Sequence, residues 1–390
     1  MREDVRRPTP PKLIGEPISV AGILEIEPNG RFGNIIGEKS FGKVQREDPI
    51  VSHDLLVRYR LRRGMWIEGK MQRVESTESN ARPRLISIDQ IDGINPSMRQ
   101  NLPRFEDRES LIPNHVLSLE NEEERLSHRI IDLFAPLSYG QRGLIVAPPK
   151  TGKTTLLHDI AAGIRKKNPE CVLLVLLVDE RPEEVTDFQR TVDAELYASS
   201  NDELRMIQIQ VAELAIERAK RLAEIGKDVV VLMDSVTRLT RAYNRQYSGG
   251  RTMTGGVDVK ALERPRMLFS TARNLEGRGS VTILATALIE TGSRMDDLIF
   301  QEFKGTGNAE IVLNKKAADM RIYPAIDLQQ SGTRREELLL PENELKAINI
   351  CRRAFMGMKP EEAIESLVSR LQKTKNNKEF LLLLQTTLSR

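Results

Sequence analysis

Two patterns of hydrophobic and polar residues divide the sequence. Between residues 18 and 91, apolar and polar residues alternate over short stretches, and turn signals such as Pro28-Asn29-Gly30 separate the stretches. This pattern predicts five strands, at residues 18–26, 34–36, 55–61, 65–74 and 85–91. Five short strands favour a small closed barrel of the oligonucleotide-binding (OB) type.

The second pattern consists of longer, nearly continuous apolar runs. They occur at residues 143–147, 172–178, 229–233 and 281–287, and helix-compatible stretches separate them, including 211–225 with apolar residues at i, i+3 and i+4. Strands that are apolar throughout need helices on both faces, so the pattern predicts a wound α/β sheet. After residue 311 we expect a short strand, then helices at 342–355 and 360–371.

These patterns predict four segments. Residues 1–15, rich in arginine and proline, are expected to form a flexible basic leader, and residues 16–95 the barrel. Prolines and an acidic cluster interrupt any regular period over residues 96–126, which indicates a connector. Residues 127–390 form the α/β domain.

Composition narrows the class of protein. A chain of 390 residues usually forms two or three domains, and contents of 39% hydrophobic and 29% charged residues exclude wholesale disorder. Cys171 and Cys351 lack the spacing of metal ligands, so we expect buried thiols in a reducing compartment. No apolar run reaches the ~18 residues of a membrane span, and nothing resembles a secretory signal. We therefore expect a cytoplasmic protein with no membrane partner.

A phosphate-binding loop follows the first apolar run of the α/β domain. Gly152 lets backbone amides approach a polyphosphate, Lys153 supplies an ammonium, and Thr154 offers a hydroxyl to Mg²⁺. The usual first glycine is Ala147 here, and the bland alternative is an ordinary turn between a strand and a helix. The residues expected to bind the nucleotide are Pro148, Pro149, Lys150, Thr151, Gly152, Lys153, Thr154 and Thr155.

Carboxylates end two of the apolar runs. Glu180 follows the second run and is placed to orient an attacking water, whereas Glu183 and Glu184 after Pro182 suit a helix cap. Asp234 ends the third run, a pattern that puts a carboxylate beside the magnesium shell. The expected metal residues are thus Thr154 and Asp234.

Aromatic and basic residues mix in the barrel. Phe32, Tyr59 and Trp66 lie near many arginines, which suits stacking on single-stranded bases, but the aromatics could instead belong to the core. In the α/β domain, two polar, glycine-rich loops at 247–256 and 290–296 suit contacts to a phosphate backbone, or are ordinary surface loops.

The motifs together resemble those of the Rho family of transcription termination factors. They occur in the same order, as Ala147-Pro-Pro-Lys-Thr-Gly-Lys-Thr, Asp179-Glu-Arg-Pro-Glu-Glu-Val, Thr254-Gly-Gly-Val-Asp, Phe303-Lys-Gly-Thr-Gly-Asn and Ser331-Gly-Thr-Arg. The resemblance implies a RecA-like P-loop ATPase domain behind an OB-fold (cold-shock-like) RNA-binding barrel. It also implies a bacterial homohexameric ring that hydrolyses ATP, moves along nascent single-stranded RNA, terminates transcription, and meets RNA polymerase and elongation factors.

The resemblance assigns roles by position. Catalytic roles fall on Lys150, Lys153, Glu180, Asp234, Arg181 and Arg334, with Arg334 resembling an arginine finger that acts on the neighbouring subunit. Tyr323 would stack on adenine. RNA contacts would come from Arg31, Phe32 and Arg60 of the barrel and from Arg251, Thr252, Thr254 and Arg294 of the two loops.

The barrel departs from the family pattern, because Asn34 and Ile50 stand where relatives carry aromatic residues. RNA anchoring is therefore expected to be weaker or altered. Two other functions remain as alternatives: a rotary-ATPase catalytic subunit, and an RNA-binding ring that does not hydrolyse ATP.

Overall fold

The computed structural model describes residues 12–75, 81–121, 125–247, 252–253 and 255–388. The chain divides into two compact units, with the division between Pro103 and Arg104. Among the described residues, no helix combines the length and apolar character needed to cross a bilayer.

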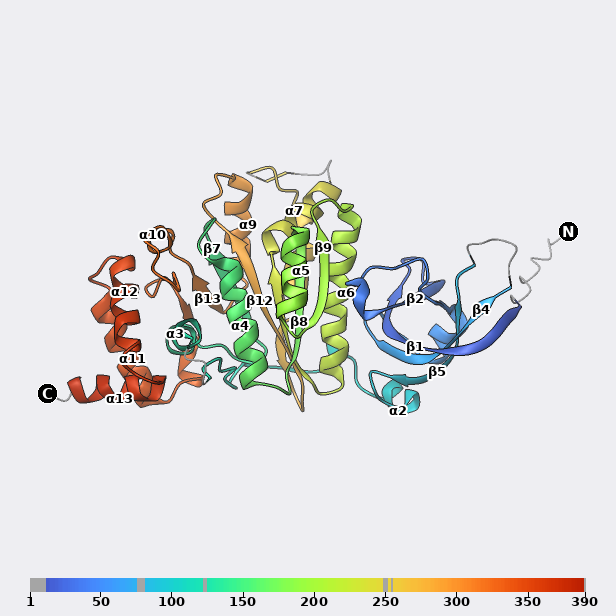
Figure 1. Cartoon of the computed structure of the whole chain (residues 1–390), viewed down its shortest axis with the longest axis horizontal. Coiled ribbons are helices and arrows are strands. Elements are labelled where there is room, and N and C mark those ends of the chain that lie inside the picture. The colour runs from blue at the N-terminus through green and yellow to red at the C-terminus, as the bar shows by residue number, and fades with distance from the viewer. Residues whose placement is uncertain (1–11, 76–80, 122–124, 248–251, 254, 389–390) are drawn as a thin grey trace. The chain divides into compact units, whose positions relative to one another are not determined.

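The first unit is a closed five-stranded barrel, drawn from blue to cyan in Figure 1. Going round the barrel, the strands are β1 (Leu13–Ile26), β2 (Phe32–Ile36), β3 (Ile50–Ser52), β5 (Arg84–Ile91) and β4 (Trp66–Val74). The core contains Leu24, Ile35, Val51 and Ile67, whose side chains are at most 1% exposed. The expected OB-type barrel is confirmed. Its first strand begins at Leu13, inside the range expected for the leader.

The prediction of a strand at residues 55–61 is wrong. This stretch begins within α1 (His53–Arg58), and the barrel takes its third strand from Ile50–Ser52 instead. Ser52 caps the helix, because its side chain accepts a hydrogen bond from the backbone N–H of Leu55. Leu56 and Leu61 still reach the barrel core, so their burial produced an apolar pattern that the sequence alone could not assign to a helix.

The second unit has a central, mostly parallel sheet in the order β14-β13-β7-β12-β10-β8-β9. The strands are β7 (Arg142–Ala147), β8 (Val172–Glu180), β9 (Glu195–Ser200), β10 (Asp228–Asp234), β12 (Ser280–Leu288), β13 (Ala309–Val312) and β14 (Gly332–Thr333). Short β11 (Arg273–Leu275) pairs with β12 and with β6 (Ser110–Leu111). The four predicted apolar runs are confirmed as β7, β8, β10 and β12. Because these strands are parallel, their carboxyl ends meet at one edge of the sheet.

Helices pack along this sheet (Figure 1). Those that contact the strands are α4 (Lys153–Lys167), α5 (Pro182–Thr191), α6 (Arg205–Glu224), α7 (Val236–Gln246) and α9 (Arg294–Lys304), and α8 (Val259–Phe269) packs on α7. The other helices are α2 (Pro96–Gln100) in the first unit, and α3 (Leu126–Phe134), α10 (Lys315–Asp319), α11 (Glu342–Phe355), α12 (Pro360–Leu371) and α13 (Asn377–Leu388). The helices predicted at 342–355 and 360–371 are confirmed with these bounds, and Cys171 and Cys351 are buried free thiols, as expected.

Candidate functional site

The phosphate-binding loop connects β7 to α4. Its backbone takes the left-handed region at Lys150 (φ 64°) and again at Gly152 (φ 88°), immediately before the helix begins. Thr151 is buried and donates its hydroxyl to the carbonyl of Pro148 at 2.8 Å, which braces the turn. The N-terminus of a 15-residue helix, with its unpaired N–H groups and positive dipole end, therefore opens at the carboxyl edge of the sheet.

Lys153 lies between two buried carboxylates from the tips of neighbouring strands. Its ammonium forms an ion pair with Asp234 at the end of β10 and lies 3.9 Å from Oε2 of Glu180 at the end of β8. Asp234 also accepts a hydrogen bond from Thr286 of β12 at 2.7 Å. The structure thus brings together Lys153, Glu180 and Asp234, which the sequence placed in one site. They meet because β7, β10 and β8 lie close together in one parallel sheet, with their carboxyl ends at the same edge.

Glu180 is held in an environment that suits a proton acceptor. Burial, together with the charge of Asp234, raises the pKa of its carboxyl group, while Arg238 and Lys153 act in the opposite direction. Arg238 lies 3.1 Å from Oε1 of Glu180. Oε2 is buried and has no hydrogen-bond partner among the described residues. A buried acceptor of this kind has the capacity to take a hydrogen bond from a water molecule.

Two of the side chains fit a magnesium ion that would arrive with a nucleotide. The hydroxyl of Thr154 is partly buried at the helix start, 3.5 Å from Glu184, and Asp234 lies beside Lys153. These are oxygen ligands, which Mg²⁺ prefers, and its remaining ligands are usually waters and phosphate oxygens. Glu183 and Glu184 lie in the first turn of α5 behind Pro182, the position expected of residues that favour the positive end of a helix.

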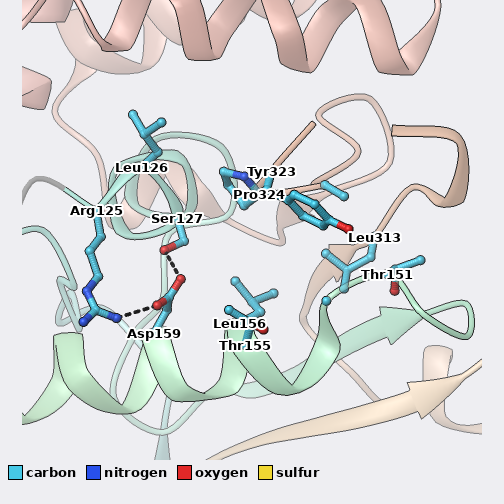
Figure 2. A pocket seen from close by; sticks show the side chains of 12 residues that line it. Arg125, Leu126, Ser127, Thr151, Thr155, Leu156, Asp159, Leu313, Tyr323 and Pro324 are labelled. Atoms are coloured by element: carbon cyan, nitrogen blue, oxygen red, sulfur yellow. Dashed lines mark hydrogen bonds and ion pairs between the residues drawn. The ribbon is translucent and has the colours of Figure 1, made fainter. Parts of the chain in front are cut away.

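A cavity of about 630 Å³ opens beside the phosphate loop (Figure 2). Thr151, Gly152 and Thr155 line one side, and Tyr323 lies opposite them, 44% exposed. A Cβ atom on Gly152 would lie 3.6 Å from Cε1 of Tyr323, so the ring lies directly beside the loop. This volume lies within the range of small-molecule sites, and the exposed aromatic face suits a planar base.

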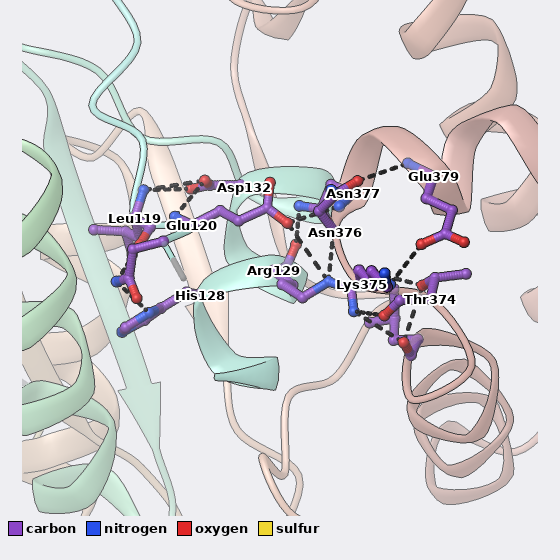
Figure 3. A network of polar contacts seen from close by, with 12 residues as sticks. Leu119, Glu120, His128, Arg129, Asp132, Thr374, Lys375, Asn376, Asn377 and Glu379 are labelled. Atoms are coloured by element: carbon purple, nitrogen blue, oxygen red, sulfur yellow. Dashed lines mark hydrogen bonds and ion pairs between the residues drawn. The ribbon is translucent and has the colours of Figure 1, made fainter. Parts of the chain in front are cut away.

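The far wall of this cavity is held by α3. Ser127 donates to Asp159 of α4 at 2.7 Å, and Arg125 pairs with the same carboxylate at 2.6 Å (Figure 2). Arg129, buried in the same helix α3, donates to the carbonyls of Leu371 and Thr374 at the turn before α13 (Figure 3). The C-terminal helices therefore fix the helix that forms one wall of the cavity.

The two candidate arginines lie at different edges of the sheet. Arg181 follows Glu180 directly and is exposed at the carboxyl edge. Arg334 is also exposed, but it lies at the amino edge, where its backbone N–H donates to the carbonyl of Asn308 at 2.8 Å. Of the described residues, none forms an ion pair with Arg334.

One helix reaches from the carboxylates to both glycine-rich loops. Arg238, in the first turn of α7, contacts Glu180, and Arg241, one turn later, holds buried Asp296 of the second loop. Asn244 bonds to the carbonyl of Gly256 at 3.1 Å and to the N–H of Asp258 at 2.7 Å in the first loop. The loops adjoin, because a Cβ atom on Gly255 would lie 3.0 Å from the carbonyl oxygen of Arg294.

Of the four residues predicted to contact RNA from these loops, the structure describes two. Thr252 and Arg294 are exposed. Arg251 and Thr254 lie outside the described residues.

In the barrel, three positions share the face opposite the core. Ile35 and Val51 point into the core, so Phe32 and Asn34 of β2, and Ile50 of β3, lie on the other face, where Asn34 pairs with Ile50. Phe32 is half-buried on this face, Arg31 precedes it in an exposed turn, and Arg60 is exposed beyond α1. Tyr59 is different, since it packs against the core, which supports the core alternative for that residue.

Several residues of the site were not anticipated from the sequence. Arg238, Arg241 and Asn244 lie three residues apart on α7. This regular polar spacing directly after Asp234 could have indicated from the sequence that one face of a helix holds the site. Ser127 and Asp159 of the cavity wall gave no such signal, because they come from distant segments, whereas Tyr323 was expected from the family resemblance.

The comparisons with known proteins agree on the second unit. The nucleotide-binding domain of the ATP synthase alpha/beta family matches residues 127–333. Transcription termination factor Rho from Pseudomonas aeruginosa is 49% identical over 370 residues, covering 94% of this chain and 88% of the relative. Rho from Chromobacterium violaceum is 46% identical with the same two coverages. Rho from Mycobacterium tuberculosis is 48% identical over 373 residues, and this chain spans 61% of its length.

Solved structures share the fold at lower identity. An ATPase of the type III secretion system of pathogenic bacteria superposes with a TM-score of 0.58 at 23% identity, over 71% of this chain and 86% of that chain. An ATP synthase subunit from Nanoarcheaum equitans gives a TM-score of 0.59 at 18% identity, over 72% and 77%. The P-loop ATPase fold is confirmed by these structures together with the matched domain.

Proposed function

Because the chain belongs to the Rho family of transcription termination factors and contains the ATP synthase alpha/beta nucleotide-binding domain, we propose that it is an RNA-stimulated ATPase that moves along RNA as a homohexameric ring. The ring is proposed to act on nascent single-stranded RNA in the cytoplasm and to meet RNA polymerase and elongation factors there. The rotary-ATPase alternative is not favoured, since its relatives resemble this chain at 18–23% identity and Rho proteins at 46–49%.

ATP occupies the loop and the adjoining cavity in this proposal. The triphosphate lies against the N-terminus of α4, with Pro148 to Thr155 around it. The Lys153 ammonium, which pairs with Asp234 in the structure, pairs with the phosphates instead. Tyr323 stacks on the adenine in the cavity opposite Gly152. Thr154 and Asp234 would hold Mg²⁺, which would neutralise charge that develops on the phosphate oxygens.

The arrangement of Glu180 is the observation that carries the proposal of hydrolysis. Its Oε2 is a buried acceptor with no hydrogen-bond partner among the described residues, at the edge where the phosphates would lie. From there it orients a water molecule for attack on the terminal phosphate. This capacity argues against a ring that only holds ATP.

RNA would contact two regions of the chain. Phe32, with Arg31 and Arg60, would hold single strands on the outer face of the barrel, and Thr252 and Arg294 would contact the phosphate backbone from the paired loops. Because α7 connects both loops to Glu180, a movement of the loops would change the position of Arg238 at the catalytic carboxylate.

The test is ATP hydrolysis by the purified protein with and without poly(C). The proposal expects slow hydrolysis alone and a large stimulation by the RNA. Hydrolysis that is fast and indifferent to RNA would support an ATPase of the rotary type instead, and absence of hydrolysis in both conditions would support the non-hydrolysing ring.

A further inference from the structure

A second cavity, of about 370 Å³, lies at the amino edge of the sheet, far from the phosphate loop. It opens where β7 begins, whereas the loop follows the end of β7, five residues later and ~17 Å away at ~3.3 Å per residue. The polar side chains around it are those of Ser110, Arg142, Ser270, Arg273 and Asn308.

The polar side chains that line this cavity can all donate hydrogen bonds. Arg142 uses Nε on the carbonyl of Thr306 at 3.1 Å and one terminal nitrogen on that of Ala272 at 3.0 Å, which leaves its other terminal nitrogen. The guanidinium of Arg273 stacks 5.0 Å from the ring centre of Phe105 and has no ion pair among the described residues. Asn308 accepts through Oδ1 from the N–H of Arg142, so its amide nitrogen is the group left to donate.

No aspartate or glutamate side chain is among the described residues that line this cavity. Burial, with the nearby positive charges of Arg273 and Arg334, lowers the pKa of Arg142. Like charges that gather without a counter-charge destabilise one another, and an anion between them would remove that cost. Guanidinium groups also match the geometry of phosphate oxygens, to which they donate in pairs.

We propose that this cavity binds a phosphate oxyanion, either free phosphate or a small phosphate monoester, through Arg142, Arg273 and Asn308. The several donors on different sides of the cavity favour the tetrahedral oxygens of a phosphate over the planar pair of a carboxylate. Because Arg334 adjoins Arg142, a bound anion would also attract the Arg334 guanidinium. If Arg334 serves a neighbouring subunit, as the proposed function holds, the anion would slow hydrolysis there.

The binding test uses the intact chain carrying Lys153→Ala together with Lys150→Ala, which removes both lysine charges of the phosphate loop. Inorganic phosphate and ribose 5-phosphate are titrated separately at constant ionic strength, with chloride as the reference salt, and binding is followed by calorimetry. We expect phosphate binding to survive these two lysine substitutions and to weaken by at least about tenfold when Arg273→Gln is added, since a charge-assisted pair of hydrogen bonds is lost. Binding of the monoester as well would show that the cavity admits it, and binding of phosphate alone would show that free phosphate is the ligand.

Two further variants make the outcome decisive. Arg278→Gln removes an exposed arginine that does not line the cavity and should leave binding unchanged. Ser270→Glu keeps both arginines and adds a carboxylate to the lining of the cavity, so it should abolish phosphate binding even if Arg273→Gln proves unstable. Loss of all binding with the two lysine substitutions alone, or binding that resists both cavity variants, would overturn the proposal. Because binding is measured without ATP, this result is independent of whether the chain hydrolyses ATP with RNA.

Discussion

Arg334 and Lys153 lie at opposite ends of the same strand. Arg334 donates its backbone N–H to Asn308, whose side chain accepts from the N–H of Arg142, the first residue of β7. Lys153 follows the loop after Ala147, the last residue of β7, ~17 Å along the strand at ~3.3 Å per residue. An arginine in this position is too far from its own phosphate loop to act there, but in the proposed head-to-tail ring it would face the loop of the next subunit.

Arg238 is predicted to set the acidic limit of activity. Glu180 must be ionised to accept a proton, so hydrolysis is lost as pH falls through its pKa, which lies above the ordinary 4.5. Arg238 lowers that pKa, so Arg238→Gln should raise it and move the acidic limb of the kcat profile to higher pH. Arg245→Gln, an exposed arginine on the same helix, is the control and should leave the limb in place. A limb that moves to lower pH would contradict the assignment of Glu180.

Tyr323 is predicted to contribute to binding of ATP through its ring. Tyr323→Ala should raise KM for ATP roughly tenfold with little change in kcat, because stacking on a base contributes ~1–3 kcal/mol. Tyr323→Phe keeps the ring and loses only a 3.4 Å hydrogen bond to the carbonyl of Ala318, so it should behave nearly as the unaltered protein. Steady-state kinetics decide this, and equal effects of the two substitutions would show that the ring does not stack on the base.

Arg241 is predicted to couple RNA to hydrolysis. Its bonds to Asp296 hold the second glycine-rich loop on α7, so Arg241→Gln should leave ATP affinity unchanged but reduce the stimulation by poly(C). Affinity is measured with a fluorescent ATP analogue and stimulation by phosphate release. Arg245→Gln serves again as the control on this helix. Full stimulation in the Arg241 variant would refute a role for this contact.

Phe32 and Arg31 are predicted to affect RNA binding in different ways. In the intact chain carrying Arg294→Ala, affinity for oligo(C) should fall with salt at ~0.7 logarithmic units per neutralised phosphate. Phe32→Ala should cost about 1–3 kcal/mol without changing that slope, whereas Arg31→Gln should make the slope shallower. A changed slope for Phe32→Ala would mean that this residue acts on the charges and not on the bases.

The sequence predicted well where Glu180, Asp234 and the phosphate loop lie, because long parallel strands are apolar throughout. The carboxyl end of each strand could therefore be recognised in the sequence, and Glu180, Asp234 and the phosphate loop stand at the ends of three strands. The α1 helix was missed for the converse reason: Leu56 within this short helix and Leu61 just after it both reach the barrel core, and a short apolar stretch of this kind does not distinguish a helix from a strand.

Contacts between distant segments could not be read from the sequence. The cavity beside the loop joins Ser127, Gly152 and Tyr323, which no periodicity links. The burial of Asn34 could not be predicted from the sequence either, because this residue lies on the outer face of β2 and yet is completely buried.

The central claim is that each active site takes Lys153 from one subunit and Arg334 from the next. Arg334→Ala and Lys153→Ala should each abolish hydrolysis stimulated by poly(C), while Arg335→Ala, a change at the adjacent exposed arginine, should preserve it. When the two inactive proteins are mixed and reassembled, an interface that joins the intact loop of one to the intact arginine of the other is complete. Stimulated hydrolysis should therefore reappear in the mixture, and a mixture that stays inactive at every ratio, although mixed rings have formed, would contradict the shared site.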